Sequence, residues 1–430
     1  MKFDLLHPAD QLVMMMDRIY TSGMTTTSGG NLSILDDNGD IWITPSGVDK
    51  GTLNRNDMCR VKPDGTVIGP HTPSVELPFH ASVFKRRPDL RAVLHAHPPH
   101  LVAFSLARKL PDVNLVANAS RTCGSLTMAA YAVPGSKALG ENIAAEFEKG
   151  INIVVMENHG VCIGAESLFE AFEMFETLET TAALEILARK LGKPKSLEEK
   201  EFNITATRDH LVMDDFVPNK HSPEECAARR DMVTLIRRSY RQNLFVSTQG
   251  TYSMRLSDGS FLITPYGVDR AYMDEADLVL IKNGMKEQGK TPSRSIGLHQ
   301  LIYQKHPEIH SVLGANPPHA MAFAVTDEPF DVRTIPESYI NLRQIQKVPF
   351  SSVYVEHEKV AGMFSDKTPV LICENAQILV TGNSLLHAFD RLEVAEATAQ
   401  SILAARDIGD LVHISDEEIK EINTAFNLPV

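Results

Sequence analysis

The sequence has few cysteines and no long apolar segment. Its five cysteines are odd in number, widely spaced and never arranged as Cys-x-x-Cys. This spacing excludes a disulfide framework and a cysteine-based zinc finger, and it fits a reducing compartment. No stretch approaches the roughly 18 apolar residues of a membrane-spanning helix, and Asp4 and Asp10 interrupt any signal-peptide pattern. We therefore expect a cytoplasmic protein without a membrane partner.

Positive charge is in the minority. The 430 residues include 42 Lys and Arg against 55 Asp and Glu, so the formal charge is −13. An acidic surface disfavours nucleic acid and anionic membranes as partners. Extensive disorder is also excluded, because 43% of the residues are hydrophobic and can form real cores. At roughly 150 to 200 residues per domain, this length predicts two domains.

The two halves of the chain resemble each other. WITPSGVDK in the first half matches LITPYGVDR in the second, AVLHAHPPH matches SVLGANPPH, and SLFEAFEMFE matches SLLHAFDRLE. The three blocks keep their order and recur 217 to 220 residues apart. A period of this length corresponds to a whole domain. We therefore predict two homologous domains, 1–215 and 216–430, separated by the polar, proline-marked segment DDFVPNKHSPEE.

Each half shows the same expected order of elements. A helix opens the half, short β-branched strands follow, and a long amphipathic helix closes it. This order predicts an α/β fold in which helices flank a central sheet. The expected helices are 9–22, 166–192 and 223–242, and the expected strands are 41–44, 93–97, 151–156 and 261–264.

The triplet His-Ala-His is the most informative motif. His95 and His97 end an expected strand, and alternate residues of a strand point to the same face. Two imidazoles placed in this way can chelate a metal ion. His159 follows another buried strand, in the turn Asn-His-Gly. Three histidines at strand ends predict an open metal site with one position left for water or substrate.

Glu76 is the candidate acidic partner of these histidines. We expect it in the first turn of a helix that Thr72 or Ser74 caps. A carboxylate there either complements the helix dipole or acts as a general acid and base beside the metal. Two polar, glycine-containing loops, 27–31 and 44–47, either present backbone N–H groups to an anion or are ordinary turns.

The repeat provides an internal comparison for these residues. All four candidate groups are replaced together in the second half, which indicates that one function was lost as a unit. His80 and His100, by contrast, keep their counterparts, so we expect both to be structural. Ser295, Gly314, Asn316 and Ala376 stand in place of Glu76, His95, His97 and His159, and His299 and His319 match His80 and His100.

In order, the motifs TSGGN, ITPSG, PSxE, HxH and NHG resemble those of the class II aldolase/adducin family, which includes fuculose- and ribulose-phosphate enzymes. The resemblance covers almost all of the first half, and the second half resembles a degenerate copy. It implies tandem α/β/α sandwiches around largely antiparallel sheets, in a homo-oligomer. We hypothesise that this oligomer is a dimer that imitates a tetramer, or a higher oligomer. It implies one Zn²⁺, or another divalent transition metal, held by His95, His97, His159 and Glu76, and a sugar or sugar-phosphate substrate bound by Gly30, Asn31, Ser46, Gly47 and Ser74.

The activity implied by this resemblance is retro-aldol cleavage of a ketose or ketose phosphate through a metal-stabilised enediolate. Glu76 then moves a proton to or from the enediolate carbon, and Tyr131 is a candidate for the aldehyde side. Val75 departs from the family pattern, because phosphosugar enzymes often carry serine there. The substrate anion is therefore a phosphate held by fewer groups, a carboxylate, or absent. An epimerase, a dehydratase, a decarboxylase and an adducin-like scaffold remain alternatives.

Overall fold

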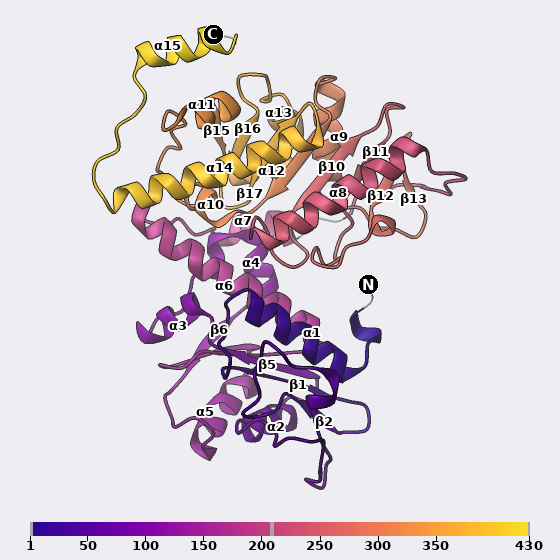
Figure 1. Ribbon diagram of the computed structural model, residues 1–430, viewed down its shortest axis with the longest axis vertical. Coiled ribbons are helices and arrows are strands. Elements are labelled where there is room, and N and C mark those ends of the chain that lie inside the picture. Colours follow the sequence, from indigo (N-terminus) through magenta and orange to yellow (C-terminus); the bar gives the residue numbers. More distant parts are fainter. Residues whose placement is uncertain (1–2, 207–209, 429–430) are drawn as a thin grey trace. The chain divides into compact units, whose positions relative to one another are not determined.

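The computed structural model describes residues 3–206 and 210–428, which fall into two compact units (Figure 1). The first unit is Met1–Val113 with Ala119–Ala183, and the second is Asn114–Asn118 with Leu184–Val430. The expected repeat boundary at 215/216 falls inside strand β9 (Asp215–Phe216), which pairs with the sheet of the second unit. The two units are defined by contacts between residues, whereas the repeats are defined by sequence similarity. The units therefore do not test the repeat boundary, which stays a proposal.

The first unit contains an eight-stranded sheet in the order β4-β3-β2-β1-β5-β8-β7-β6. All neighbouring strands are antiparallel except β6 and β7, which are parallel. The central strand β5 is buried along its whole length, as its apolar sequence predicts. The strands are β1 (Asn31–Leu35), β2 (Ile41–Ile43), β3 (Cys59–Val61), β4 (Val67–Ile68), β5 (Ala92–Ala96), β6 (Leu126–Ala129), β7 (Ile153–Met156) and β8 (Val161–Ala165).

Helices cover both faces of this sheet (Figure 1). On one face α2 and α5 pack together, and their apolar side chains form a core with β5, β7 and β8. On the other face α1 begins with a proline in its first turn and buries one apolar stripe beside β1 and β2. The helices of the first half are α1 (Pro8–Thr21), α2 (Leu77–Arg86), α3 (Pro99–Leu106), α4 (Ala117–Cys123), α5 (Lys137–Glu148) and α6 (Leu168–Leu191). The first two residues of α4 and the last eight of α6 belong to the second unit.

The second unit repeats this plan with a nine-stranded sheet, β15-β16-β17-β14-β10-β11-β12-β13-β9. Among the described strands of this second sheet, only the pairs β15–β16 and β13–β9 are parallel. The remaining strands are β10 (Thr251–Arg255), β11 (Phe261–Ile263), β12 (Val279–Lys282), β13 (Met285–Glu287), β14 (Ser311–Ala315), β15 (Ile345–Val348), β16 (Val370–Cys373) and β17 (Gln377–Gly382). Its helices are α7 (Glu199–Ala206), α8 (Pro223–Arg241), α9 (Ile296–Lys305), α10 (Pro318–Ala324), α11 (Pro336–Leu342), α12 (Phe350–Val355), α13 (His357–Ala361), α14 (Leu385–Arg406) and α15 (Asp416–Ala425).

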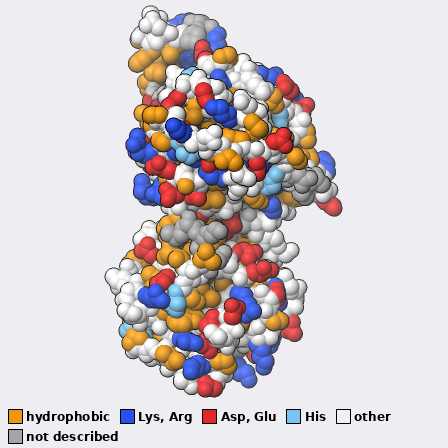
Figure 2. All heavy atoms as spheres, turned by 90° about the vertical axis from the view of Figure 1, so that its right-hand side faces the viewer, with side chains coloured by type: hydrophobic (Ala, Val, Ile, Leu, Met, Phe, Trp, Pro, Cys, Tyr) orange, Lys and Arg blue, Asp and Glu red, His pale blue; other side chains and the backbone are white. Residues whose placement is uncertain are grey.

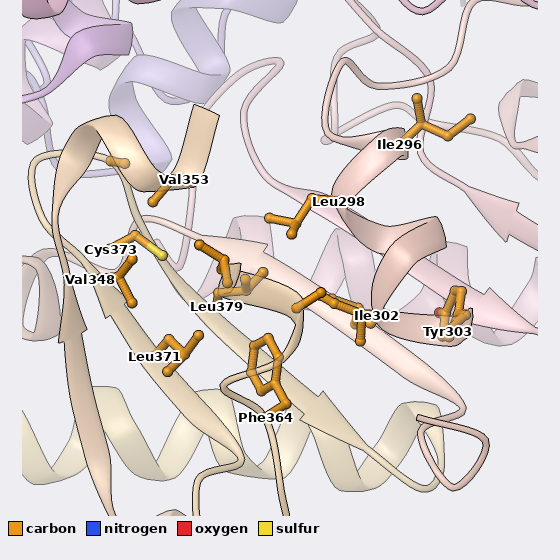
Figure 3. Packing of buried hydrophobic residues seen from close by; sticks show 14 of the residues in the cluster. Ile296, Leu298, Ile302, Tyr303, Val348, Val353, Phe364, Leu371, Cys373 and Leu379 are labelled. Atoms are coloured by element: carbon orange, nitrogen blue, oxygen red, sulfur yellow. The ribbon is translucent and has the colours of Figure 1, made fainter. Parts of the chain in front are cut away.

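The second unit has a hydrophobic core of its own. Figure 3 shows side chains from α9, α12 and the strands β15 to β17 converging in it. Ala117 and Leu197, which precede the second repeat in sequence, belong to the same cluster. On the face shown in Figure 2, acidic and basic side chains are interspersed over both units. The second half is therefore a folded domain. Neither acidic nor basic side chains predominate on the face shown in Figure 2.

The observed architecture confirms the expected fold class, two α/β units around largely antiparallel sheets. The expected helices and strands are found within one or two residues of their predicted ends, for example 9–22 as α1 and 93–97 as β5. Because β5 ends at Ala96, His97 lies just beyond the strand. Within the described ranges, no helix combines the length and apolarity needed to cross a membrane.

Candidate metal centre

Separate elements of the first unit bring the predicted histidines together. His95 is the fourth residue of β5, and His97 follows the strand directly. His159 lies in the turn between β7 and β8, where Asn158 adopts a positive φ of 52°. This turn is closed by hydrogen bonds between Met156 and Gly160 and between His159 N–H and Met156 O. Because β8 pairs with both β5 and β7, the turn lies beside the end of β5.

The three imidazoles converge closely enough to bind one ion. One ligand nitrogen from each of His95, His97 and His159 lies within 4.8 Å of the others. The Nε2 atoms of His95 and His97 are 3.0 Å apart, which confirms that both side chains point to one face. His95 is fully buried, while His97 and His159 are partly exposed and leave the cluster open on one side.

Glu76 turns its carboxylate toward this cluster. Its Oε2 lies 3.2 Å from His95 Nε2, and its Oε1 lies 3.6 Å from His159 Nε2. The expected position in the first turn of a helix is wrong by one residue, because Glu76 is the N-cap of α2. Neither Thr72 nor Ser74 caps α2; instead, the Ser74 hydroxyl accepts a hydrogen bond from the Glu76 N–H. The carboxylate makes no capping bond and so remains available to the histidines.

Burial keeps the histidines neutral. Desolvation, reinforced by the neighbouring imidazoles, lowers the pKa of His95 and of His97 to about 3. Burial lowers the pKa of His159 as well, against the opposing effect of Glu76. Near neutral pH all three rings therefore have the uncharged form that coordinates a metal ion.

The arrangement of lone pairs fits a bound cation. His95 Nδ1 lies 2.9 Å from the Val161 carbonyl oxygen, and a carbonyl only accepts, so Nδ1 carries the proton. His95 Nε2 then presents a lone pair to the Glu76 carboxylate, which has only lone pairs to offer. His159 Nδ1 is buried and has no hydrogen-bond partner among the described residues. The facing lone pairs of His95 Nε2 and of the Glu76 carboxylate cost free energy unless a cation lies between them. Three imidazoles with a carboxylate suit Zn²⁺ or a similar transition metal.

The loops expected to bind substrate are brought together at the same end of the sheet. Asn31 lies opposite His95 in the β1–β5 pairing, and an added side chain at Gly30 would come within 2.8 Å of the His95 carbonyl oxygen. Ser46 N–H donates to Thr72 O, and Ser74 N–H donates to Thr44 O. Ser74 is buried and Gly47 is exposed, with a positive φ of 70°. The Asn31 side chain binds Glu76 and not open space, because its Nδ2 donates to Oε2 at 2.7 Å.

Lys50 is a residue of this region that the motifs did not identify. It is buried, its backbone N–H donates to Thr27 O, and its Nζ donates to Pro45 O at 2.6 Å. It therefore joins the two polar loops, and burial lowers its pKa. The repeat could have revealed it, because Arg270 stands at the matching position and binds Pro265 O and Gly250 O in the same way.

Two further residues singled out from the sequence are exposed. Tyr131, in the loop before α5, is 56% exposed, and its backbone N–H donates to Glu157. No contact between its hydroxyl and the three histidines occurs among the described residues, so its catalytic role stays a prediction. Val75 is 65% exposed and lies against Gly135 of the same loop. An apolar side chain thus faces solvent directly beside Glu76.

His100 and His319 occupy equivalent positions in the two units. His100 Nδ1 lies 2.7 Å from Glu179 Oε1, and His319 Nδ1 lies 2.6 Å from Glu396 Oε1. In both units the same carboxylate accepts the backbone N–H groups of the histidine and of the next residue, in the first turn of the short helix α3 or α10. The shared geometry supports the structural role that the repeat comparison predicted for His100.

The matching region of the second unit is refilled with other side chains. An added Cβ at Gly314, the counterpart of His95, would lie 2.5 Å from Gln377 Oε1. Gln377 itself corresponds to Gly160, where an added Cβ would lie only 2.4 Å from Ala96 O. The first unit thus has histidine at 95 and glycine at 160, whereas the second has glycine at 314 and glutamine at 377. Gln377 takes the space that the imidazole of His95 fills in the first unit. Asn316, which replaces His97, donates to Ala376 O at 2.5 Å.

Comparison with known proteins agrees with this geometry. The family model of the class II aldolase and adducin N-terminal domain matches residues 10–186 and 230–403. A 5-deoxy-D-ribulose 1-phosphate aldolase of Bacillus thuringiensis is 32% identical over 205 residues, which are 46% of this chain and 93% of that protein. A 3-oxo-tetronate 4-phosphate decarboxylase of Escherichia coli is 29% identical over 179 residues, 41% of this chain and 84% of that protein.

Among solved structures, an L-fuculose 1-phosphate aldolase is 30% identical and covers 46% of this chain and 94% of its own, with a TM-score of 0.42. The family assignment depends on the sequence matches and not on this score. The names of the relatives are those of lyases, which confirms the expected enzyme class of a metal-dependent lyase. Since the two regions matched by the family model together span most of the sequence, this chain belongs to the class II aldolase and adducin family.

Proposed function

We propose that this protein cleaves a carbon–carbon bond of a ketose phosphate by a retro-aldol reaction, with one divalent ion per chain, preferably Zn²⁺. The observation that carries this proposal is the convergence of His95, His97 and His159 on the carboxylate of Glu76. The relatives add support, because one of them is named as an aldolase of a ketose 1-phosphate.

In this proposal the side chains of the first unit bind the ion and move protons. A bound divalent ion supplies a Lewis acid that polarises a carbonyl oxygen of the substrate. When the bond breaks, the hydroxyl proton passes to the ionised carboxylate of Glu76, an aldehyde departs and the electron pair stays on the carbon beside the carbonyl. Glu76 delivers a proton from a carboxyl oxygen to that carbon. Asn31 holds the carboxylate in place through its 2.7 Å hydrogen bond.

The substrate anion is assigned to the two polar loops and the start of α2. Gly30, Ser46, Gly47 and Ser74 border this region, and the hydrogen bonds between the loops tie them together. The buried cation of Lys50 lies between the loops and favours an anion nearby. Val75 cannot donate a hydrogen bond, so we assign phosphate recognition to backbone N–H groups and the serine hydroxyls.

A decarboxylase is the second candidate function. One relative is named a 3-oxo-tetronate 4-phosphate decarboxylase. Loss of CO₂ from a 3-oxo acid also leaves an electron pair on the carbon beside a carbonyl group. The same Lewis acid and the same proton donor therefore serve either reaction.

A substrate panel with the zinc-loaded full chain tests the proposal. The panel contains 5-deoxy-D-ribulose 1-phosphate, L-fuculose 1-phosphate, their unphosphorylated ketoses and a 3-oxo-tetronate 4-phosphate. We expect aldehyde release from a phosphorylated ketose and a fall in kcat of about 100-fold or more in Glu76→Gln. Ser295→Ala, at the matching position of the second unit, should leave kcat unchanged. Release of CO₂ alone would favour the decarboxylase, and no turnover of any panel member would contradict both candidates.

We also propose a homo-oligomer in a reducing cytoplasm. All five cysteines are unpaired, and four of them are buried, which suits a compartment without disulfide formation. The second unit keeps a folded core after its metal-site residues have been replaced, which supports a role in assembly. We infer that two tandem chains imitate a four-subunit arrangement. Light scattering of the purified chain tests this, and a monomer with full activity would contradict it.

A further inference from the structure

A buried series of hydrogen bonds leads from β1 through α2 to the carboxylate of Glu76. Asn31 Nδ2 donates to Glu76 Oε2 at 2.7 Å. On its other side, Asn31 Oδ1 lies 2.5 Å from His80 Nε2. His80 Nδ1 in turn lies 2.6 Å from Ser33 Oγ. His80 and Ser33 are fully buried, so bulk water does not compete for these contacts.

The carboxylate determines the direction of every bond in this series. An ionised carboxylate only accepts, so Asn31 must turn its NH₂ group toward Glu76 and its carbonyl oxygen toward His80. That oxygen also only accepts, so His80 must carry its proton on Nε2. Nδ1 is then an acceptor, and the Ser33 hydroxyl donates to it. A neutral His80 in a single tautomer satisfies all three contacts.

We propose that His80 is a positioning residue for the proton-transfer step assigned to Glu76. Its Nε2–H holds the Asn31 carbonyl oxygen and so prevents the amide from flipping. A flipped amide would turn an oxygen toward the carboxylate, and Glu76 would lose its donor and move away from its partners. This inference rests on the function proposed for Glu76. It revises the expectation that His80 is merely structural.

The second unit shows the same histidine without the carboxylate. His299 Nδ1 lies 2.8 Å from Ser253 Oγ, which matches the contact between His80 and Ser33. Asn31 and Glu76 are replaced there by Thr251 and Ser295, and the Thr251 hydroxyl bonds Ser293 at 2.7 Å. His299 therefore has no carboxylate to orient in this position. It provides a matched control for the packing role that both histidines share.

Replacement of His80 in the zinc-loaded full chain tests the inference, with the panel substrate that the native chain cleaves. In His80→Leu we expect one zinc per chain, KM within about twofold of native and kcat lower by about 10- to 100-fold. The zinc dissociation constant, measured by competition with a chelator, should rise about tenfold because Glu76 is no longer held. His80→Gln offers a donor and an acceptor at similar positions and should restore most of kcat. His299→Leu should lower Tm by a similar amount without changing kcat.

Two reference variants keep the outcomes distinct. If His80→Leu fails to fold, Ser33→Ala decides, because removing the donor to Nδ1 should lower kcat severalfold in a folded protein. Native kcat and zinc affinity in the folded His80 variant, or a His80→Gln variant as slow as His80→Leu, would overturn the inference. Glu76→Gln separates it from the proposed function: if that variant stays fully active, the role of Glu76 is wrong, and the role of His80 is wrong with it.

Discussion

At the scale of single residues, burial of histidines makes the metal-free protein sensitive to acid. Desolvation lowers the pKa of His80 and of His95 to about 3, whereas an exposed histidine in the unfolded chain titrates near 6.5. Between these values the unfolded chain binds more protons than the folded chain. The free energy of unfolding therefore falls as the pH drops from 6.5 toward 3, by up to about 1.4 kcal/mol per pH unit for each such histidine.

Urea unfolding of chelator-treated protein at pH 7, 6 and 5 measures this slope. We predict that His95→Ala is less stable than the native chain at pH 7 but loses less stability on acidification. The number of protons taken up on unfolding should differ by nearly one between the two proteins, because one buried histidine has been removed. Equal slopes for the two proteins would show that His95 takes up its proton over the same pH range in the folded and unfolded states, and would contradict the pKa shift ascribed to its burial.

Sequence spacing predicted the histidines of the site but not the hydrogen bonds that hold them. Alternation in a strand suffices to place His95 and His97 on one face, and the internal repeat separated the replaced residues from the retained ones. The retention of His80 and His299 indicates the contact with serine that both share, but it does not reveal the contact between His80 and Asn31, since Thr251 stands in place of Asn31 in the second half. Lys50 was missed for a related reason, since Arg270 preserves its role with a different side chain.

At the scale of elements, the turn between β7 and β8 determines where His159 lies. Gly160 has no room for a side chain, because an added Cβ would lie 2.4 Å from Ala96 O and 2.8 Å from His97 Cδ2. We predict that Gly160→Ala displaces the turn and lowers metal content and kcat together. Gly192→Ala is the control, because no atom lies within 4 Å of the added Cβ and the protein should remain fully active.

Elemental analysis and circular dichroism of both glycine variants check this prediction. A folded Gly160→Ala protein with one metal per chain and native kcat would show that the metal site does not need the close approach of Gly160 to Ala96 and His97. The sequence indicated the turn through Asn158 and Gly160, as such residues commonly do. It did not reveal that Gly160 lies against His97, because that contact depends on the pairing of β8 with both β5 and β7.

The ends of most elements could also be predicted from the sequence. The expected helices 9–22 and 223–242 lie within a residue of the observed bounds of α1 and α8. The start of α2 was misjudged because Ser74 resembles an N-cap in sequence. In the fold, the Ser74 hydroxyl accepts the N–H of Glu76 instead, and the helix begins later, at Leu77.

At the scale of the whole molecule, the repeat boundary differs from the boundary of the compact units. Asn114–Asn118 and the residues from Leu184 onward belong to the second unit. Asn375 Nδ2 donates to the carbonyl oxygens of Leu115 and Lys195, and Ala117 and Leu197 lie in the hydrophobic core of that unit. Sequence similarity between the repeats does not show that residues 114–118 and the segment around Leu197 pack in the second unit, because these segments have no recognisable motif.

A truncation at the repeat boundary should therefore be poorly soluble. A chain of residues 1–215 leaves Leu115, Ala117 and Leu197 without the core and hydrogen bonds they have in the full protein. We expect aggregation or proteolysis of this fragment, together with loss of activity. Gel filtration and limited proteolysis beside the full chain measure this. A monodisperse, active fragment would show that the second unit is dispensable.

We infer that the first unit holds one metal centre and that the described residues of the second unit form none. Elemental analysis of the full chain, purified without chelator or added metal, tests it most directly. We predict about one zinc or similar ion per chain, lost in His95→Ala and retained in Asn316→Ala, the matched change in the second unit. Absence of metal even after reconstitution with zinc, cobalt or manganese, or full metal content in His95→Ala, would contradict the account.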